Sequence, residues 1–279
     1  RIDEANVLVV SGLWRDNLLE TGKKLSYIQA ISAGYDQFPL DKLNTRAVRL
    51  ANARGVNADA VSHHAMGLVL ALARQLHLAR DQQHNCYWRP MISDHAQRED
   101  DLCGQTMLII GLGEIGSRLA KLAKVFGMRV LGVKQDISRH DGTADEVYAP
   151  CQLSTLFSQA DFVVLCCPLT STTRNLIDKS ALSAMKSSGQ LVNVARGGCV
   201  DETALANALT KGQIASAAID HFCDEPLPVD SPFWSMENLV ITPHSAGETR
   251  KYEDNVIDIL IQNLDRLWAG NEELVNQIL

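Results

Sequence analysis

The sequence predicts an α/β protein built on a doubly wound parallel sheet. Short apolar runs with the length of buried strands alternate with stretches of helical period along most of the chain. A glycine-rich segment at 111–116 joins one such run to one such helix through a tight turn. The 279 residues are 46% hydrophobic, which is enough for about two domains with sizeable cores.

The first third of the chain predicts a small α/β region followed by a long buried helix. Residues 65–73 are apolar almost all round, as expected of a helix covered on every side. The polar segment 82–101 has no clear period, and we expect it to be a connecting arm. Strands are expected at 7–10, 25–31 and 48–52, and helices at 14–21, 39–46 and 58–80.

From residue 106 onward the pattern predicts a larger parallel sheet. The final helix, 247–269, has apolar residues at 256, 257, 260, 261, 264 and 268, and we expect it to return to the first region. The chain is therefore divided into a domain formed by 1–58 with 248–279 and a domain formed by 59–247. The expected strands are 106–110, 129–133, 146–148, 161–165, 190–194, 215–219 and 239–242, and the expected helices are 114–126, 152–158, 178–185 and 201–211.

Composition and charge argue against several classes of protein. The net charge is −7 with both signs interspersed, so we expect neither nucleic-acid binding nor attachment to a membrane surface. The apolar stretches are too short to span a bilayer, and we expect no secretory signal. Seven cysteines at irregular spacing predict reduced thiols and a cytoplasmic location. No His/Cys cluster has metal-ligand spacing, so no metal site is expected.

Gly111, Gly113 and Gly116 form the pattern G-x-G-x-x-G between a buried strand and a helix. In that context Gly111 permits a tight turn, Gly113 lets the backbone approach a pyrophosphate, and Gly116 lets the helix pack closely on the strand. The helix N-terminus, at Glu114 and Ile115, would then face the anion. Three glycines without this context are more often a chance pattern. Here they predict a bound dinucleotide.

Three polar side chains further along the chain carry groups suited to catalysis. Arg196 lies in N-V-A-R-G-G, Glu225 in C-D-E-P and His244 in I-T-P-H-S-A-G, and each follows a strand-like run. An arginine fork can hold a carboxylate or polarise a carbonyl. A histidine can deliver a proton, and a glutamate can hold that histidine upright and protonated. Each residue alone is an ordinary polar residue at a strand end, but together, after a dinucleotide motif, they indicate reduction of a 2-keto acid.

A longer series of short segments occurs in order along the chain: A-G-Y-D (33–36), G-L-G-E-I-G, F-G-M-R-V (126–130), C-P-L-T-S-T-T-R-N-L-I (167–177), N-V-A-R-G, D-H-F-C-D-E-P and T-P-H-S-A-G. Over almost its whole length the chain resembles the D-isomer-specific 2-hydroxyacid dehydrogenases, in particular the members that resemble glyoxylate/hydroxypyruvate reductases. The resemblance implies a Rossmann cofactor domain and a smaller, flavodoxin-like split substrate domain, with the active site in a cleft between them.

The resemblance also implies roles for single residues. Arg196 would bind and polarise the keto acid, His244 would donate the proton, and Glu225 would be the hydrogen-bonded partner of His244. Backbone N–H groups of Ala33 and Gly34 would hold the substrate carboxylate. Further cofactor contacts are expected at Cys167, Pro168, Thr173, Ala195, His244 and Gly247, and at Asp220, which would face the nicotinamide carboxamide.

Two features depart from the family's pattern. The family's substrate domain opens with another strand–helix–strand segment, whereas this chain starts inside it, at Arg1, so we expect a truncated or shortened domain. At the end of strand 129–133, relatives that prefer NAD place an acid that binds the ribose 2′-hydroxyl. Lys134 stands there instead, with Arg139 five residues further on. Unless Lys134 is only a solvated loop lysine, these cations favour NADP, with NAD as the alternative.

Two function classes stay open at this point. In the first, the chain is a dehydrogenase or reductase; in the second, it is a dinucleotide-sensing interaction protein like the transcriptional corepressors that resemble this family. The chain has no charged tail or low-complexity extension suited to assembly, which favours the enzyme. The resemblance also implies a symmetric homodimer, in which the arm packs against the second subunit. The side chain of the 2-keto acid is not specified by the sequence.

Overall fold

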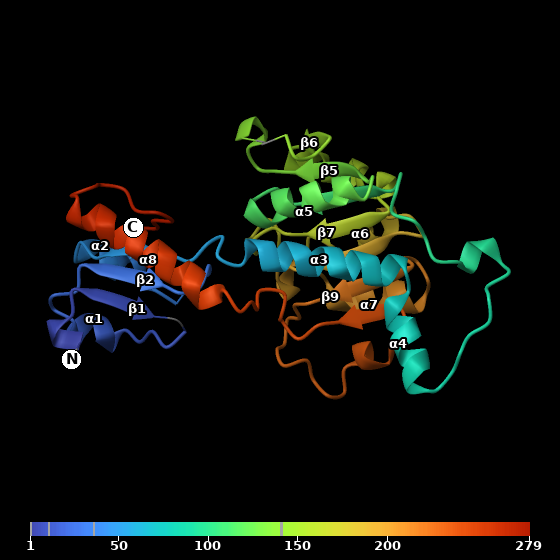
Figure 1. Ribbon diagram of the computed structural model, residues 1–279, viewed down its shortest axis with the longest axis horizontal. Helices are drawn as coiled ribbons and strands as arrows, with labels where there is room; N and C mark the ends of the chain where they lie inside the picture. Colours follow the sequence, from blue (N-terminus) through green and yellow to red (C-terminus); the bar gives the residue numbers. More distant parts are fainter. Residues whose placement is uncertain (1, 11, 36, 140–141) are drawn as a thin grey trace. The chain divides into compact units, whose positions relative to one another are not determined.

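The computed structural model describes residues 2–10, 12–35, 37–139 and 142–279, and it divides into two compact units (Figure 1). The smaller unit comprises Arg1–Ala58 with Glu248–Leu279, and the larger unit is Asp59–Gly247. Asp36, the last residue of the A-G-Y-D segment, lies outside the described residues. Both units contain a parallel sheet and helices, which confirms the predicted α/β fold class.

The sheet of the larger unit has seven parallel strands in the order β10-β9-β8-β7-β4-β5-β6. Strand β4 lies between β5 and β7, so the chain winds outward from it in both directions, as the doubly wound prediction required. All five residues of β4 are buried, because a parallel sheet is covered on both faces. The strands are β4 (Thr106–Ile110), β5 (Arg129–Val133), β6 (Glu146–Tyr148), β7 (Phe162–Leu165), β8 (Gln190–Asn193), β9 (Ser216–Ile219) and β10 (Leu239–Ile241).

Helices cover both faces of this sheet (Figure 1). One face packs against α3 (Ala58–Ala73) and α5 (Glu114–Val125), and the other against α6 (Lys179–Ala184) and α7 (Glu202–Thr210). The starts of α6 and α7 are fixed locally by capping aspartates. Asp178 accepts a hydrogen bond from the Ala181 amide at 2.8 Å, and Asp201 accepts one from the Ala204 amide at 2.9 Å.

Two predicted helices of the larger unit differ from the structure. The helix expected at 58–80 is two helices, α3 and α4 (Leu76–His84), because Gln75 between them adopts a left-handed conformation with φ 50°. None of the described α4 residues is buried, so the buried apolar face of α3 does not continue into α4. The segment expected as a helix at 152–158 forms two 3₁₀ helices, Pro150–Thr155 and Phe157–Gln159, whose buried Leu153 and Phe157 still cover the sheet.

The smaller unit contains a three-stranded parallel sheet in the order β1-β2-β3, formed by Val7–Val10, Tyr27–Ala30 and Arg49–Ala51. Helices α1 (Asn17–Thr21) and α2 (Leu40–Thr45) contribute Leu19 and Leu43 to the core on one face. Helix α8 (Tyr252–Trp268) packs on the other face through Leu260 and Leu264. Asn263 of α8 is fully buried and donates to the Tyr27 hydroxyl at 2.9 Å. This contact fixes the register of α8 on the sheet.

The surface of α8 differs from the sequence expectation. The helix begins at Tyr252 rather than at 247, and the side chains of Ile257, Ile261 and Trp268 are exposed.

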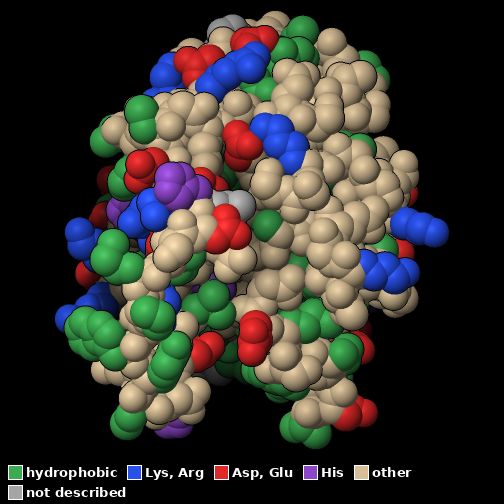
Figure 2. All heavy atoms as spheres, turned by 90° about the vertical axis from the view of Figure 1, so that its right-hand side faces the viewer, with side chains coloured by type: hydrophobic (Ala, Val, Ile, Leu, Met, Phe, Trp, Pro, Cys, Tyr) green, Lys and Arg blue, Asp and Glu red, His purple; other side chains and the backbone are tan. Residues whose placement is uncertain are grey.

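On the face shown in Figure 2, charged side chains of both signs are interspersed with hydrophobic ones. Within the described residues, no helix combines the length and apolar character needed to cross a membrane.

Candidate active site

The site residues predicted in the larger unit lie at the carboxyl ends of its parallel strands. Neighbouring parallel strands end at the same edge of a sheet, so segments far apart in the sequence meet there. The strand order reverses at β4, and α/β sheets bind their ligands at the carboxyl edge beside such a reversal. Gly111 follows β4, Lys134 follows β5, Cys167 and Pro168 follow β7, Arg196 follows β8, Asp220 follows β9, and His244 follows β10.

The glycine loop has the close approaches that its sequence pattern predicts. Gly111 has φ 105°, and a Cβ on it would lie 2.7 Å from the backbone nitrogen of Cys167. A Cβ on Gly116 would lie 2.1 Å from the Gly111 carbonyl oxygen. Gly113 precedes α5, and a Cβ there would meet nothing within 4 Å, so its backbone is open. This cradle fits the pyrophosphate of a dinucleotide at a helix N-terminus.

A basic cavity of about 490 Å³ adjoins this loop. Its lining includes Gly113, Arg118, Lys121, Lys134 and Arg139. The Lys134 Nζ donates to the Arg139 carbonyl oxygen at 2.7 Å, so the lysine is held within the loop after β5. Arg118 already pairs with both Asp59 and Glu114, at 2.6 Å each. The remaining positive charge at this cavity suits a phosphate group.

Three residues of this region were not predicted from the sequence. Arg118 and Lys121 face the cavity from α5, and their spacing of three residues on a helix was the available indication. Asp136 is an acid in the same loop. Its carboxylate accepts from the amide and hydroxyl of Ser138 and pairs with Arg139 at 3.4 Å. The hydrogen bonds from Ser138 lower the pKa of Asp136, so this carboxylate is charged and already engaged.

The expected cofactor residues after β7 and β8 mostly serve the local structure. The Thr173 hydroxyl donates to the Pro168 carbonyl oxygen at 2.6 Å and accepts from the Thr170 amide at 2.7 Å, which closes this loop. Cys167 and Ala195 are buried, so only their backbones are suited to line a groove. Gly247 is partly exposed at the end of the larger unit.

Glu225 and His244 form a close pair. The Nδ1 of His244 lies 2.7 Å from Oε2 of Glu225, and the side chains are 53% and 36% exposed. The other Glu225 oxygen accepts from the Phe222 amide at 3.1 Å. Burial acts to raise the pKa of Glu225, but the hydrogen bonds from His244 and Phe222 outweigh it and hold the pKa below its usual value. A charged carboxylate behind a partly exposed imidazole is an arrangement suited to proton transfer.

Asp220 holds the loop that presents His244. His244 has φ 54°, a conformation that few residues other than glycine adopt. The Asp220 carboxylate accepts from the Thr242 hydroxyl at 2.5 Å and from the amides of Ser245 and Ala246 at 3.0 and 3.1 Å. Asp220 is 1% exposed, and its expected contact with the nicotinamide carboxamide stays a prediction. These three hydrogen bonds support the loop that carries His244.

His221 was assigned no role in the sequence analysis, yet its ring packs against that of His244. The two ring centroids are 3.9 Å apart, in an edge-on arrangement of 62°. His221 is 5% exposed, and burial lowers its pKa to about 4, with the neighbouring charge of His244 acting in the same direction. His221 is therefore neutral near pH 7. Its position directly after a strand, in D-H-F-C-D-E-P, was the only indication in the sequence.

Arg196 is exposed, and its Nη1 donates to the Ala195 carbonyl oxygen at 2.7 Å. Gly197, which the sequence analysis did not single out, brings this segment to the Glu225 turn. A Cβ on Gly197 would lie 2.1 Å from the Phe222 carbonyl carbon, so no larger residue fits without a backbone shift. The close contact places the segment that carries Arg196 beside the turn that carries His221 and Glu225.

Ala33 and Gly34 belong to the smaller unit and lie in the loop after β2. The Ala33 carbonyl oxygen accepts from the Asn52 side chain at 2.6 Å, and the Gly34 carbonyl oxygen accepts from the Ser32 hydroxyl at 2.7 Å. These bonds fix the conformation of the loop.

Comparison with known proteins points to one family. Residues 66–246 match the family model described as the NAD binding domain of D-isomer specific 2-hydroxyacid dehydrogenases. Glyoxylate/hydroxypyruvate reductase B from Enterobacter sp. (strain 638) is 38% identical over 259 residues, which is 92% of this chain and 79% of that relative. Glyoxylate reductase from Korarchaeum cryptofilum (strain OPF8) is 33% identical over 266 residues, which is 93% of this chain and 79% of that relative.

The fold has close counterparts among solved structures. A D-isomer specific 2-hydroxyacid dehydrogenase family protein from Aeromonas salmonicida subsp. salmonicida A449 superposes with a TM-score of 0.84 at 35% identity. The match covers 99% of this chain and 86% of that one. The resemblance stated from the sequence is thereby confirmed. The chain belongs to the D-isomer-specific 2-hydroxyacid dehydrogenase family, and it is an oxidoreductase of 2-hydroxy and 2-keto acids.

Proposed function

We propose that the protein reduces a small 2-keto acid, such as glyoxylate or hydroxypyruvate, to the D-2-hydroxy acid, with NADPH as the preferred cofactor. The observation that carries this proposal is the Glu225–His244 pair, held at the carboxyl edge of the sheet beside the segment of Arg196. In this proposal 59–247 is the dinucleotide-binding domain, and 1–58 with 248–279 is the substrate domain. The names of the reductases described above support the choice of substrate.

The residues of the chain would divide the reaction as follows. When bound, the nicotinamide supplies a hydride to the carbonyl carbon. The Arg196 fork binds the carboxylate or the carbonyl oxygen and polarises the substrate. His244 donates a proton to the carbonyl oxygen as negative charge develops there, and the Glu225 carboxylate stabilises the imidazolium before transfer. The Ala33 and Gly34 amides are proposed to hold the substrate carboxylate.

Removal of the proton donor tests this assignment. His244→Ala should lower kcat by about 10²–10⁴-fold, since this is the usual contribution of a general acid. Affinity for the cofactor should change little, because the glycine loop remains intact.

Arg196→Lys should lower kcat/KM by at least about 100-fold, because the lysine cannot keep the two-point geometry. His63→Ala, which removes an exposed histidine of α3, is the control.

The kcat and kcat/KM of the parent and its variants are measured with a panel of 2-keto acids, with NADPH and with NADH. Full activity in His244→Ala would exclude the proposed proton donor. A parent protein that binds NADPH but turns over none of the acids would instead favour a dinucleotide-sensing role.

The pH profile tests the role of Glu225. A carboxylate stabilises a protonated His244 and a neutral amide does not, so Glu225→Gln should shift the alkaline limb of kcat/KM to lower pH. In the parent, hydrogen bonds hold the pKa of Glu225 below its usual 4.5. The ion pair of Glu225 with a protonated His244 therefore persists as pH falls to 4.5 and is lost only at lower pH. The exposed Glu237→Gln is the matched control. Superimposable profiles of Glu225→Gln and the parent would remove Glu225 from the mechanism.

The preference for NADPH rests on the basic cavity at the glycine loop. A 2′-phosphate carries close to two negative charges at neutral pH. Lys121, Lys134 and Arg139 line the cavity together with the Glu114–Arg118 pair, and each of these three cations could add a charge-assisted hydrogen bond. Asp136 opposes this preference, but Ser138 and Arg139 already occupy its carboxylate. We therefore keep Lys134 and Arg139 as the proposed 2′-phosphate ligands.

A charge reversal at Lys134 should reverse the cofactor preference. A charge-assisted hydrogen bond contributes about 1.5–3 kcal/mol, and about 1.4 kcal/mol is a factor of ten. The parent should therefore favour NADPH over NADH by about tenfold or more in kcat/KM, and Lys134→Asp should favour NADH. Lys211→Asp, an exposed lysine outside this cavity, makes the same charge change and should leave the ratio unaltered. Equal kcat/KM values for both cofactors in the parent would contradict the proposal.

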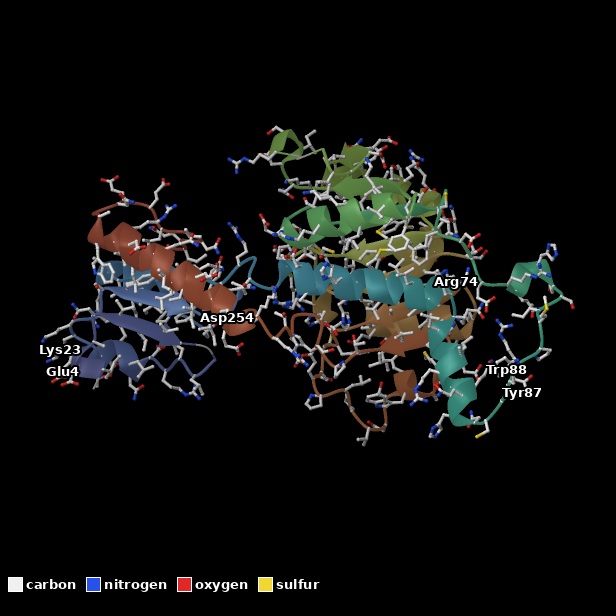
Figure 3. The ribbon with its side chains drawn as sticks, in the orientation of Figure 1. Glu4, Lys23, Arg74, Tyr87, Trp88 and Asp254 are labelled. Atoms are coloured by element: carbon white, nitrogen blue, oxygen red, sulfur yellow. The ribbon has the colours of Figure 1, made fainter. Side chains whose placement is uncertain are left out.

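The arm between α4 and β4 supports a symmetric homodimer. Trp88 and Met91 are 95% and 89% exposed, and Tyr87 is also exposed (Figure 3). An ion pair between Arg89 and Glu99 holds the arm across its base. Several large apolar side chains exposed on one segment are a feature of association surfaces. A reducing, cytoplasmic location remains a proposal that rests on the seven unpaired cysteines.

Light scattering should return a dimer at micromolar concentration. Trp88→Asp combined with Met91→Asp should give a monomer, because two buried charges would face an apolar surface. Val229→Asp is the control, since Val229 is equally exposed but lies outside the arm. A monomeric parent would refute the proposed assembly.

A further inference from the structure

The proposed proton donor, His244, lies close to two other side chains that can bind a metal ion. His221, Glu225 and His244 each offer one ligand atom, and these atoms all lie within 4.8 Å of one another. The residues come from the end of β9, the turn after it and the loop after β10. Their spacing in the sequence did not indicate a metal site, because the fold rather than a short motif brings them together.

His221 lies between two carboxylates. Its Nε2 is 3.4 Å from Oδ2 of Asp220, and its Nδ1 is 3.7 Å from Oε1 of Glu225. A neutral imidazole has one N–H and one lone pair. Whichever nitrogen carries the proton, the other lies within 3.7 Å of a carboxylate oxygen. A cation next to the lone pair would turn the repulsion between this nitrogen and the carboxylate into an attraction.

The buried Asp220 favours one of the two arrangements. Histidines that bind metals usually donate their second ring N–H to a carboxylate, which fixes the tautomer. The fully buried Asp220 carboxylate lies 3.4 Å from Nε2 of His221, so its charge favours a proton on that nitrogen. Nδ1 of His221, which then carries the lone pair, lies 3.7 Å from one Glu225 oxygen, and Nδ1 of His244 lies 2.7 Å from the other. Two imidazole nitrogens and a carboxylate thus converge on one point.

We propose that His221, Glu225 and His244 form a reversible, inhibitory binding site for a divalent transition-metal ion of the zinc class. Imidazole and carboxylate ligands suit zinc, and three protein ligands leave one position for water. The inhibitory part of this proposal rests on the proposed catalytic role of His244. The metal-binding part rests on the geometry alone.

The side chains need only a small movement to close around the ion. Zinc holds nitrogen and oxygen ligands at about 2.0–2.2 Å in a tetrahedron, so its ligands lie about 3.4 Å apart. The widest separation of 4.8 Å must therefore contract by about 1.4 Å. His244 and Glu225 are 53% and 36% exposed, which gives both side chains room to rotate and gives the ion a path from solvent. His221 is enclosed and would be the fixed ligand.

Metal binding would remove the proton donor from the reaction. In a neutral ring that donates from Nδ1 to Glu225, the proton moves to Nε2, so that the Nδ1 lone pair binds the ion in place of the hydrogen bond. Binding to a protonated ring would release one proton to solvent. In either case His244 can no longer be held as an imidazolium by Glu225. The metal would therefore inhibit reduction, and a chelator would restore it.

Titration calorimetry of the cofactor-free full chain with Zn²⁺ tests the site directly. The parent should bind one ion per chain at this site. His221→Phe keeps a ring in the same space without a ligand atom, and it should weaken binding by more than about tenfold, since loss of even a supporting partner costs about 10–100-fold. His221→Asn serves as a second variant if the phenylalanine disturbs folding. His63→Gln, which removes an exposed histidine of α3, should bind as the parent does.

The absorption spectrum of added Co²⁺ gives an independent view of the ligands. The parent should show the visible bands of a four-coordinate site, and both His221 variants should lose them. Equal Zn²⁺ affinities in the parent and in both His221 variants would overturn the proposal, and so would an equal loss in His63→Gln. None of these measurements depends on turnover, so failure of the proposed enzyme activity would not mimic failure of the metal site.

Discussion

The buried carboxylate of Asp220 is the interaction on which the site depends. It accepts three hydrogen bonds from Thr242, Ser245 and Ala246, which surround His244 in the sequence. The left-handed backbone of His244 costs about 1–3 kcal/mol, whereas each hydrogen bond to a charged group contributes about 1.5–3 kcal/mol. The carboxylate therefore offsets the strain. The Thr242 hydroxyl oxygen also lies 3.1 Å from Nε2 of His64, so the same loop is connected to α3.

Close backbone contacts provide the second constraint. Gly111 and Gly116 let the loop after β4 pass against Cys167 and the start of α5, and Gly197 lets the arginine segment pass against Phe222. Each contact excludes a Cβ, so each fixes one strand end relative to another. The parallel sheet supplies the common edge, and these glycines set the distances along it.

The enclosure of His221 has two consequences that follow from the same geometry. Its buried, neutral ring packs against His244 and restricts the orientation of that ring. Its ring nitrogens also lie near Asp220 and Glu225, which brings together the three side chains of the proposed metal site. A histidine supported by a carboxylate is suited to hold a proton, and the same atoms are suited to hold a metal ion. The chemistry of the site is therefore sensitive to a single buried side chain.

The sequence by itself determined the fold class, the glycine cradle and the family, because strand and helix periods and short motifs are local properties of the chain. It also indicated Arg196, Glu225 and His244, since each follows a strand-like run within a few residues. Only the tertiary structure decided what surrounds them. The burial of Asp220, the contact of His221 with His244 and the break at Gln75 depend on residues distant in sequence or on backbone angles. Periodicity carries no information on either, because it records which face is apolar and not which atoms meet across it.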